Sequence, residues 1–200
     1  PAVMAVMFAK SMMELMSRAG IDCCGGVAII PTAYPFFRGY TLTEQLCDAA
    51  KKSMRALNLP GGSSWLDFAI LHGEQAPTLD QIRRAEYRGA RGNLHFGPYR
   101  VDNRNAKSAI DRRHNIENLL ECTARFKAKD MAGGKIKELR SVLQHGRDDA
   151  ARFFQQLKRQ NQSLPVSIRS RRNVSSLFGI TILFNCPCRY CSKRATSCWV

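Results

Sequence analysis

The sequence predicts an α+β fold in which helices cover a small sheet and a small helical bundle follows. The clearest strand lies in residues 23–30, which are apolar and rich in β-branched side chains. Apolar residues at helical spacing predict helices over residues 2–18 and 41–57. The same spacing recurs between glycine breaks in residues 105–160, as is typical of short packed helices.

The first predicted helix, residues 2–18, is rich in methionine, and we expect these side chains to fill the core against the sheet. Residues 1–16 are apolar, but no basic segment precedes them and Glu14 lies within them, which argues against a signal peptide. The chain starts at Pro1, so we expect it to be a fragment or a processed product.

The strand over residues 23–30 is expected to be central and covered on both faces, because its apolar run is unbroken. Gly25 and Gly26 indicate a bulge or the close approach of a ligand or another backbone segment. Two prolines end the strand, since proline cannot donate to a ladder. Thr41 and Glu44 have the spacing of a capping box and predict the start of the next helix.

Residues 65–71 predict a second strand, which we expect to lie antiparallel to the first, with both helices on one face of the sheet. Asp67 in this strand is expected to point to solvent; the alternative is an acid that supports a site. Residues 73–93 are interpreted as a loop and residues 94–101 as an extended segment. His95 has no partner at ligand spacing and is expected to be an ordinary loop or strand side chain.

The formal charge of +15 is unevenly distributed. Residues 1–78 carry six basic and six acidic side chains, residues 79–160 carry nineteen and ten, and residues 161–200 carry six and none. A basic second half indicates a polyanion partner, most simply nucleic acid, with contacts predicted at Lys107, Arg112 and Arg113. The alternative is that these charges keep the helices soluble.

The eight cysteines fall into two groups. Four lie in apolar patterns and are interpreted as small buried side chains of a protein with reduced thiols in the cytoplasm, namely Cys23, Cys24, Cys47 and Cys122. The other four have the spacing C-x-C-x₂-C-x₆-C and could hold zinc, or be unpaired thiols in a disordered tail, namely Cys186, Cys188, Cys191 and Cys198.

A set of short segments carries a resemblance to a known family. Cys24–Ile29 reads as small-Gly-Gly-Val-Ala-Ile, Tyr34-Pro35-Phe36 follows, and the next helix contains Ala50-Lys51. The similarity continues through Trp65–Phe68 to Leu94–Val101. Together these segments resemble the palm domain of the large subunit of type III CRISPR effector complexes and, more distantly, diguanylate-cyclase-type palm domains.

The resemblance implies a ferredoxin-like, nucleotidyl-cyclase-like palm that is incomplete at its N-terminus. It implies a partial palm over residues 1–104, a C-terminal helical domain over residues 105–160, and a basic tail over residues 161–200 that is disordered or non-homologous. It also implies a role in an RNA-guided antiviral complex in the cytoplasm, with other effector subunits and guide and target RNA as partners and no membrane. In that family the palm makes cyclic oligoadenylate from ATP with divalent metals.

The metal ligands of that family lie in a Gly-Gly-Asp-Asp hairpin. This sequence contains no Gly-Gly-Asp-Asp motif, and we expect the hairpin to lie upstream of the first residue. Gly146-Arg147-Asp148-Asp149 is interpreted as a helix start instead. The resemblance therefore implies a scaffold that supplies one wall of a nucleotide pocket, and whether the chain itself is an enzyme stays open.

By resemblance the nucleotide contacts would be Cys24, Gly25 and Lys51, with Lys51 facing the phosphates. Cys24 stands where the family usually has serine, so it lacks the hydroxyl that would donate a hydrogen bond. The main alternative is a stand-alone basic nucleic-acid-binding protein without nucleotide chemistry. A complete cyclase of another kind is disfavoured because paired acids are missing.

Overall fold

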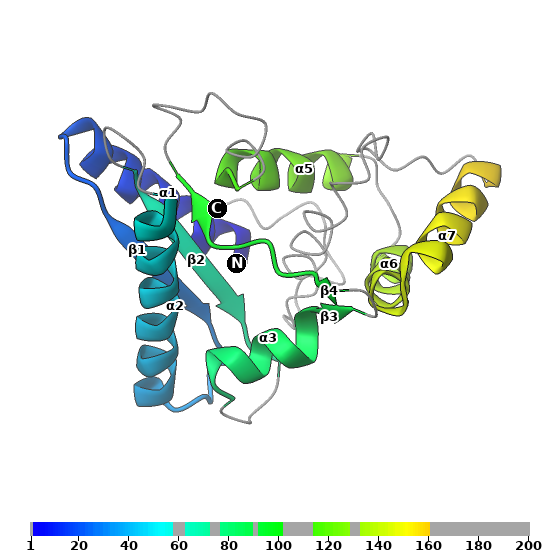
Figure 1. Cartoon of the computed structure of the whole chain (residues 1–200), viewed down its shortest axis with the longest axis horizontal. Coiled ribbons are helices and arrows are strands. Elements are labelled where there is room, and N and C mark those ends of the chain that lie inside the picture. Colours follow the sequence, from blue (N-terminus) through cyan, green and yellow to red (C-terminus); the bar gives the residue numbers. More distant parts are fainter. Residues whose placement is uncertain are drawn as a thin grey trace.

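The computed structural model describes residues 2–57, 63–72, 77–89, 92–101, 114–128 and 133–160. Within these ranges the chain is α+β, with six helices, a three-stranded mixed sheet and a two-stranded ribbon, which confirms the predicted class (Figure 1). Residues 102–113 and 161–200 lie outside the described part, and with them the predicted nucleic-acid contacts Lys107, Arg112 and Arg113 and the four C-terminal cysteines.

The sheet is built around a β-α-β unit. Strand β1 (Cys24–Ile29) is followed by helix α2 (Phe36–Leu57) and strand β2 (Trp65–Ile70), and β1 and β2 run parallel with Cys24 opposite Trp65. The prediction of antiparallel pairing is therefore wrong. The physical reason is that α2 returns the chain to the start of β1, as a parallel pair requires.

Strand β5 (Tyr99–Arg100) pairs antiparallel with β2 and gives the order β1-β2-β5. The central strand is thus β2, whose six residues are all buried, and not β1, whose six residues are only partly buried. The prediction that residues 23–30 form the central strand is wrong in this respect, although cover on both faces is confirmed for them.

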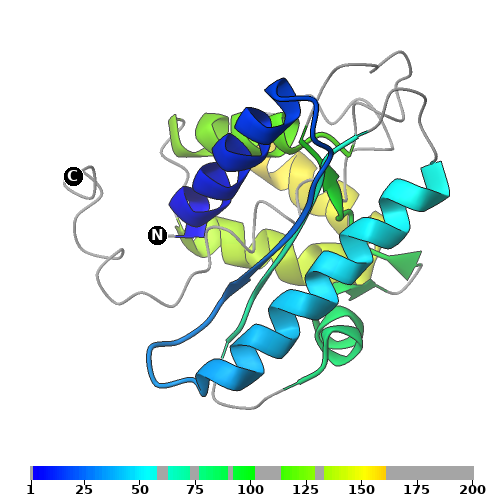
Figure 2. The same ribbon diagram turned by 90° about the vertical axis from the view of Figure 1, so that its left-hand side faces the viewer.

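The two long helices lie on opposite faces of the sheet, and the prediction that they share one face is wrong (Figure 2). A Cβ built on Gly25 would meet Met13 of helix α1 (Ala2–Arg18), whereas one built on Gly26 would meet the backbone of α2. Neighbouring strand residues point to opposite faces, so the two glycines identify the two layers. This arrangement lets β2 bury both of its faces.

Helix α1 has the predicted boundaries, but most of its methionines do not fill the core. Its sheet side carries small or medium side chains such as Ala2, Val6 and Ser17, with Met13 the buried methionine. Six large apolar side chains of α1 are exposed instead, namely Met4, Met7, Phe8, Met12, Leu15 and Met16.

Helix α2 begins at Phe36, so the capping box predicted at Thr41 is wrong. Pro35 precedes the helix and its carbonyl accepts from the N–H groups of Arg38 and Gly39. Thr41 and Glu44 lie inside the helix, where the Thr41 hydroxyl donates to the Phe37 carbonyl at 3.0 Å.

A helix also occupies the segment interpreted as a loop. Helix α3 (Leu79–Tyr87) starts at a capping box in which the Gln81 N–H donates to Thr78 Oγ1 and the Thr78 N–H donates to Gln81 Oε1. The short strands β3 (Arg88–Gly89) and β4 (Gly92–Asn93) follow and pair with each other. The glycines that suggested a loop lie in this ribbon.

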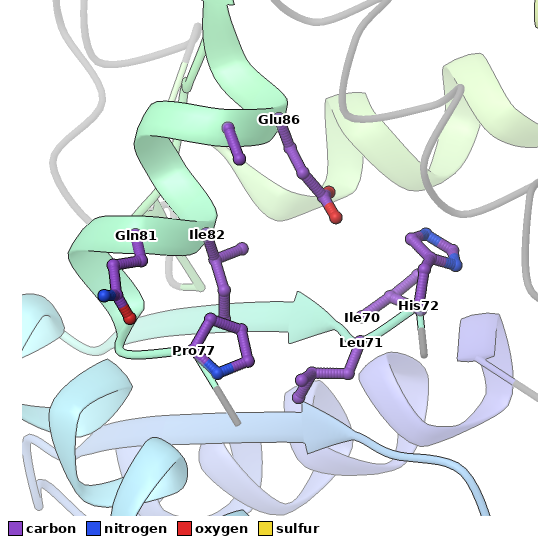
Figure 3. A pocket seen from close by; sticks show the side chains of 8 residues that line it. Ile70, Leu71, His72, Pro77, Gln81, Ile82 and Glu86 are labelled. Carbon is purple, nitrogen blue, oxygen red and sulfur yellow. The ribbon is translucent and has the colours of Figure 1, made fainter. Parts of the chain in front are cut away.

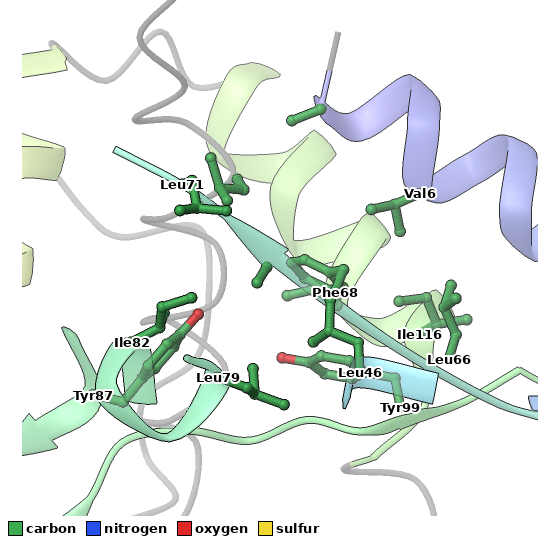
Figure 4. Packing of buried hydrophobic residues seen from close by; sticks show 14 of the residues in the cluster. Val6, Leu46, Leu66, Phe68, Leu71, Leu79, Ile82, Tyr87, Tyr99 and Ile116 are labelled. Atoms are coloured by element: carbon green, nitrogen blue, oxygen red, sulfur yellow. The ribbon is translucent and has the colours of Figure 1, made fainter. Parts of the chain in front are cut away.

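The later helices pack onto the same core. Helix α5 (Ile116–Ala128) buries Ile116 and Leu119 in the cluster that contains the sheet residues (Figure 4). Helices α6 (Gly133–His145) and α7 (Arg147–Arg159) pack against each other, and α6 contacts α3 through Arg140 and Gln144. Among the described residues, no helix is both long and apolar enough to cross a bilayer.

Candidate functional site

The central strand of the sheet carries a buried carboxylate, that of Asp67. Asp67 is 1% exposed, so the prediction that it points to solvent is wrong. Its strand is covered by α2 on one face and α1 on the other, which leaves no wet face. Asp67 pairs in register with Gly26 and therefore points to the α2 side.

Three groups surround this carboxylate. The Arg83 guanidinium of α3 lies 2.5 Å from Asp67 Oδ2, and the Phe68 N–H donates to Oδ1 at 3.0 Å. His95 Nε2 lies 3.8 Å from Oδ1, and its ring meets the Tyr87 ring edge-on. A Cβ on Gly97 would lie 2.8 Å from Oδ1, so only glycine lets this loop pass so close to the carboxylate.

Burial controls the ionisation of this cluster. It raises the pKa of Asp67 to about 6, although the Arg83 charge and the hydrogen bond from the Phe68 N–H act in the opposite direction. Burial, helped by the Arg83 charge, lowers the pKa of His95 to about 3. At neutral pH the cluster is therefore a carboxylate–guanidinium pair beside an uncharged imidazole.

Arg83 also reaches a cavity of about 540 Å³ between α2 and α3. Cationic and hydroxyl groups converge on it from two helices, together with two carboxylates that reduce its positive character. Its lining comprises Gln45, Asp48, Ala49, Lys52, Ser53, Thr78, Leu79, Asp80, Arg83 and Pro98. Such a lining can bind a polar ligand through Lys52 and Arg83.

The structure does not bring the three predicted nucleotide contacts together. Cys24 points to the α2 face, with Sγ 3.6 Å from Met54 Sδ, while Gly25 faces α1. Lys51 is exposed and its Nζ lies 3.3 Å from Asp48 Oδ1. Lys52, about 100° further around the helix, is the lysine that lines the cavity.

A second cavity of about 480 Å³ lies beyond the C-terminal end of β2 (Figure 3). The floor is apolar, and Glu86 and His72 face each other across it (Figure 3). Burial raises the pKa of Glu86 although Arg140 lies 3.7 Å away, and burial and Arg140 together lower the pKa of His72. Strand ends of this kind often hold ligands in α/β sheets.

Sequence reasoning missed both cavities because each is lined by α3. A signal was present, since Thr78 and Gln81 have the spacing of a capping box and Leu79 and Ile82 are apolar at helical spacing. The interpretation of His95 as a loop side chain is confirmed, but its position beside Asp67 could not be foreseen from spacing along the chain.

Metal-ligand geometry does not appear in the part of the chain that the structure describes. No group of three or more His, Cys, Asp or Glu side chains there is arranged to hold an ion. Asp148 and Asp149 lie in the first turn of α7, which confirms their interpretation as helix-start acids.

Comparison with models of protein families and with curated proteins finds no match to this chain.

Proposed function

We propose that this chain is part of the large palm-domain subunit of a type III CRISPR effector complex. In this role it is a scaffold that contributes one wall of a nucleotide pocket and contacts RNA or neighbouring subunits. It lacks the Gly-Gly-Asp-Asp metal site and performs no nucleotidyl transfer on its own.

One observation carries the proposal. Three segments that resemble the family are far apart in the sequence, at residues 24–29, 65–68 and 94–101. They contain, in that order, β1, most of β2 and β5, which are the three strands of one sheet. The resemblance therefore covers one continuous sheet of the described chain.

The cavity between α2 and α3 is the described surface best suited to be the pocket wall. Lys52 and Arg83 bring cations to it, and Ser53 and Thr78 bring hydroxyl groups. A triphosphate is bound by such cations and donors. This assigns the phosphate contact to Lys52 in place of the predicted Lys51.

The purified chain should form no cyclic or linear oligoadenylate from ATP with magnesium or manganese, because it has no paired acids to align the metals. Chromatography and mass spectrometry of the reaction products measure this. A product whose formation is lost in Asp148→Asn and Asp149→Asn variants would contradict the proposal and identify α7 as the active element.

A second candidate, a stand-alone nucleic-acid-binding protein, is favoured by the surplus of nine basic side chains over residues 79–160. It shares with the first candidate the expectation of RNA binding, and it differs in having no nucleotide pocket and no effector partners.

Replacing Lys107, Arg112 and Arg113 by glutamine should reduce the salt dependence of single-stranded RNA binding. Each lost phosphate contact lowers the slope of log affinity against log salt by about 0.7, so three contacts lower it by about 2. Fluorescence anisotropy at several salt concentrations measures the slope. As a control, neutralising the exposed Arg18, Arg38 and Arg55 in residues 1–78, where basic and acidic side chains are equal in number, should leave the slope unchanged. Equal slopes for wild type and the first variant would contradict this assignment.

A further inference from the structure

The cavity beyond the C-terminal end of β2 is separate from the proposed nucleotide pocket. Its volume is about 480 Å³, which is within the range of cavities that bind small molecules. The residues that end β2 form one side, and a face of α3 other than the one that carries Arg83 forms the opposite side (Figure 3). The lining comprises Ile70, Leu71, His72, Pro77, Gln81, Ile82, Ala85 and Glu86.

The α3 side of this cavity is apolar in the middle and polar at both ends. Gln81 and Glu86 are about 7.5 Å apart along the helix axis, and Ile82 and Ala85 lie between them. The Gln81 Oε1 accepts from the Thr78 N–H at 2.8 Å, while the amide nitrogen of Gln81 can donate to a ligand. An apolar strip between two polar groups suits a flat ring that carries a polar substituent.

Glu86 offers a hydrogen-bond acceptor to the cavity. Its carboxylate points toward the His72 ring on the opposite side (Figure 3). Among the described residues, no donor lies within hydrogen-bond distance of the buried Glu86 Oε2, and the Arg140 guanidinium is 3.7 Å from it. The Gln144 Nε2 of α6 donates to the Glu86 carbonyl at 3.0 Å and fixes the backbone there. Because a buried acceptor without a donor is unfavourable, an N–H group of a ligand would stabilise this end of the cavity.

The charges around Glu86 favour a ligand that is itself neutral. Arg140 offsets the charge of the Glu86 carboxylate. Burial, helped by the Arg140 charge, lowers the pKa of His72, so its imidazole is uncharged at neutral pH. An anion would be repelled by Glu86 and a cation by Arg140. The uncharged imidazole has one donor nitrogen and one acceptor nitrogen, so it can donate to a ligand carbonyl.

We propose that this cavity binds a neutral amide on a planar ring, either a carboxamide or the lactam of a heterocyclic base. The amide N–H donates to Glu86, and the amide carbonyl accepts from His72. The ring packs on Leu71 and Ile82, and Gln81 donates to its far end. This ligand does not depend on the nucleotide pocket, because the two cavities are lined by different residues.

Isothermal titration calorimetry of the full chain with two matched pairs of probes tests the proposal. Nicotinamide is compared with nicotinate, which replaces the amide by a carboxylate. Inosine is compared with adenosine, which lacks the lactam N–H. We expect nicotinamide, inosine or both to bind with a Kd below about 1 mM. The matched probe should bind at least about tenfold more weakly, because it presents an acceptor to Glu86 in place of a donor. The probe that binds identifies the carboxamide or the lactam as the ligand group.

Two substitutions locate the binding in this cavity. Glu86→Gln should weaken it about tenfold, because a charge-assisted hydrogen bond becomes a neutral one. Ala85→Trp should abolish it, since the exposed Ala85 lines the cavity and the larger ring fills it. Asp80→Asn is the matched control: it makes the same acid-to-amide change on α3, but Asp80 lines the other cavity, so the affinity should not change.

Circular dichroism and thermal unfolding verify that each variant is folded. The proposal is overturned if neither nicotinamide nor inosine binds at up to about 5 mM. It is also overturned if nicotinate and adenosine bind as well as their partners, or if Glu86→Gln and Ala85→Trp both leave the affinity unchanged.

Discussion

Gly26→Ala is expected to lower the free energy of unfolding by about 3 kcal/mol or more. A Cβ at this position would clash with the Thr43 carbonyl oxygen and would lie 2.8 Å from the Cys47 backbone N and 2.9 Å from Leu46 Cβ. Two of these three atoms belong to the backbone of α2, so no side-chain rotation relieves the contact. The helix must move away from both strands that it covers.

Gly25→Ala is the matched control in the same strand. Its Cβ would meet Leu66 Cδ1 at 3.2 Å and Met13 Sδ at 3.3 Å, which are ends of flexible side chains. We expect a change within about 1 kcal/mol, because these side chains can shift. Urea unfolding followed by circular dichroism measures both variants. Equal effects would show that α2 does not approach β1 as closely as the structure has it.

Arg83→Met is expected to lower the free energy of unfolding by about 2–3 kcal/mol at pH 7. It leaves the carboxylate of Asp67 buried without its cation, while the methionine keeps much of the packing of the arginine stem. Arg84→Met, one residue further along α3, should have little effect because the Arg84 side chain is exposed.

The free energy of unfolding lost in Arg83→Met should depend on pH in a defined direction. The pKa of Asp67 in the folded chain, about 6, lies above that of an unfolded aspartate, so the folded state loses stability as pH rises toward 6. Removing Arg83 raises the pKa of Asp67 in the folded chain further. The stability of the variant therefore continues to fall as pH rises through 7. At pH 5 Asp67 is protonated in both proteins, and the variant's penalty should be about 1 kcal/mol smaller than at pH 7.

An Asp67→Asn background provides the decisive control for this mechanism. There Arg83→Met should cost the same at pH 5 and pH 7, because no carboxylate remains to titrate. A pH-dependent penalty that persists in this background would assign it to another group, such as His95.

The elements that could be predicted are those whose signal lies within their own residues. The boundaries of α1 and the positions of β1 and β2 follow from apolar periodicity and β-branched residues. The prediction of antiparallel pairing failed because strand direction depends on where α2 leads the chain, which no residue of either strand encodes. Helix α3 was missed because Pro77 and the nearby glycines outweighed the Thr78–Gln81 capping box.

The environment of Asp67 could not be predicted for a related reason. A lone acid in a strand usually faces water, and this expectation holds for a sheet with one open face. Here β2 is central and covered on both faces, so Asp67 is buried and meets Arg83 of α3, a helix whose proline and glycine neighbours are typical of a loop. The site depends on tertiary packing across elements far apart in the sequence.

We propose that this chain works inside an RNA-guided effector complex. The most direct test is to isolate the assembly that contains the chain, through an affinity tag on the chromosomal copy of its gene, and to sequence the RNA that it carries. We expect a bound RNA with a constant repeat-derived end and variable guide sequences, in an amount comparable to that of the protein. Recovery of the chain without RNA, or with cellular RNA of random sequence, would contradict it.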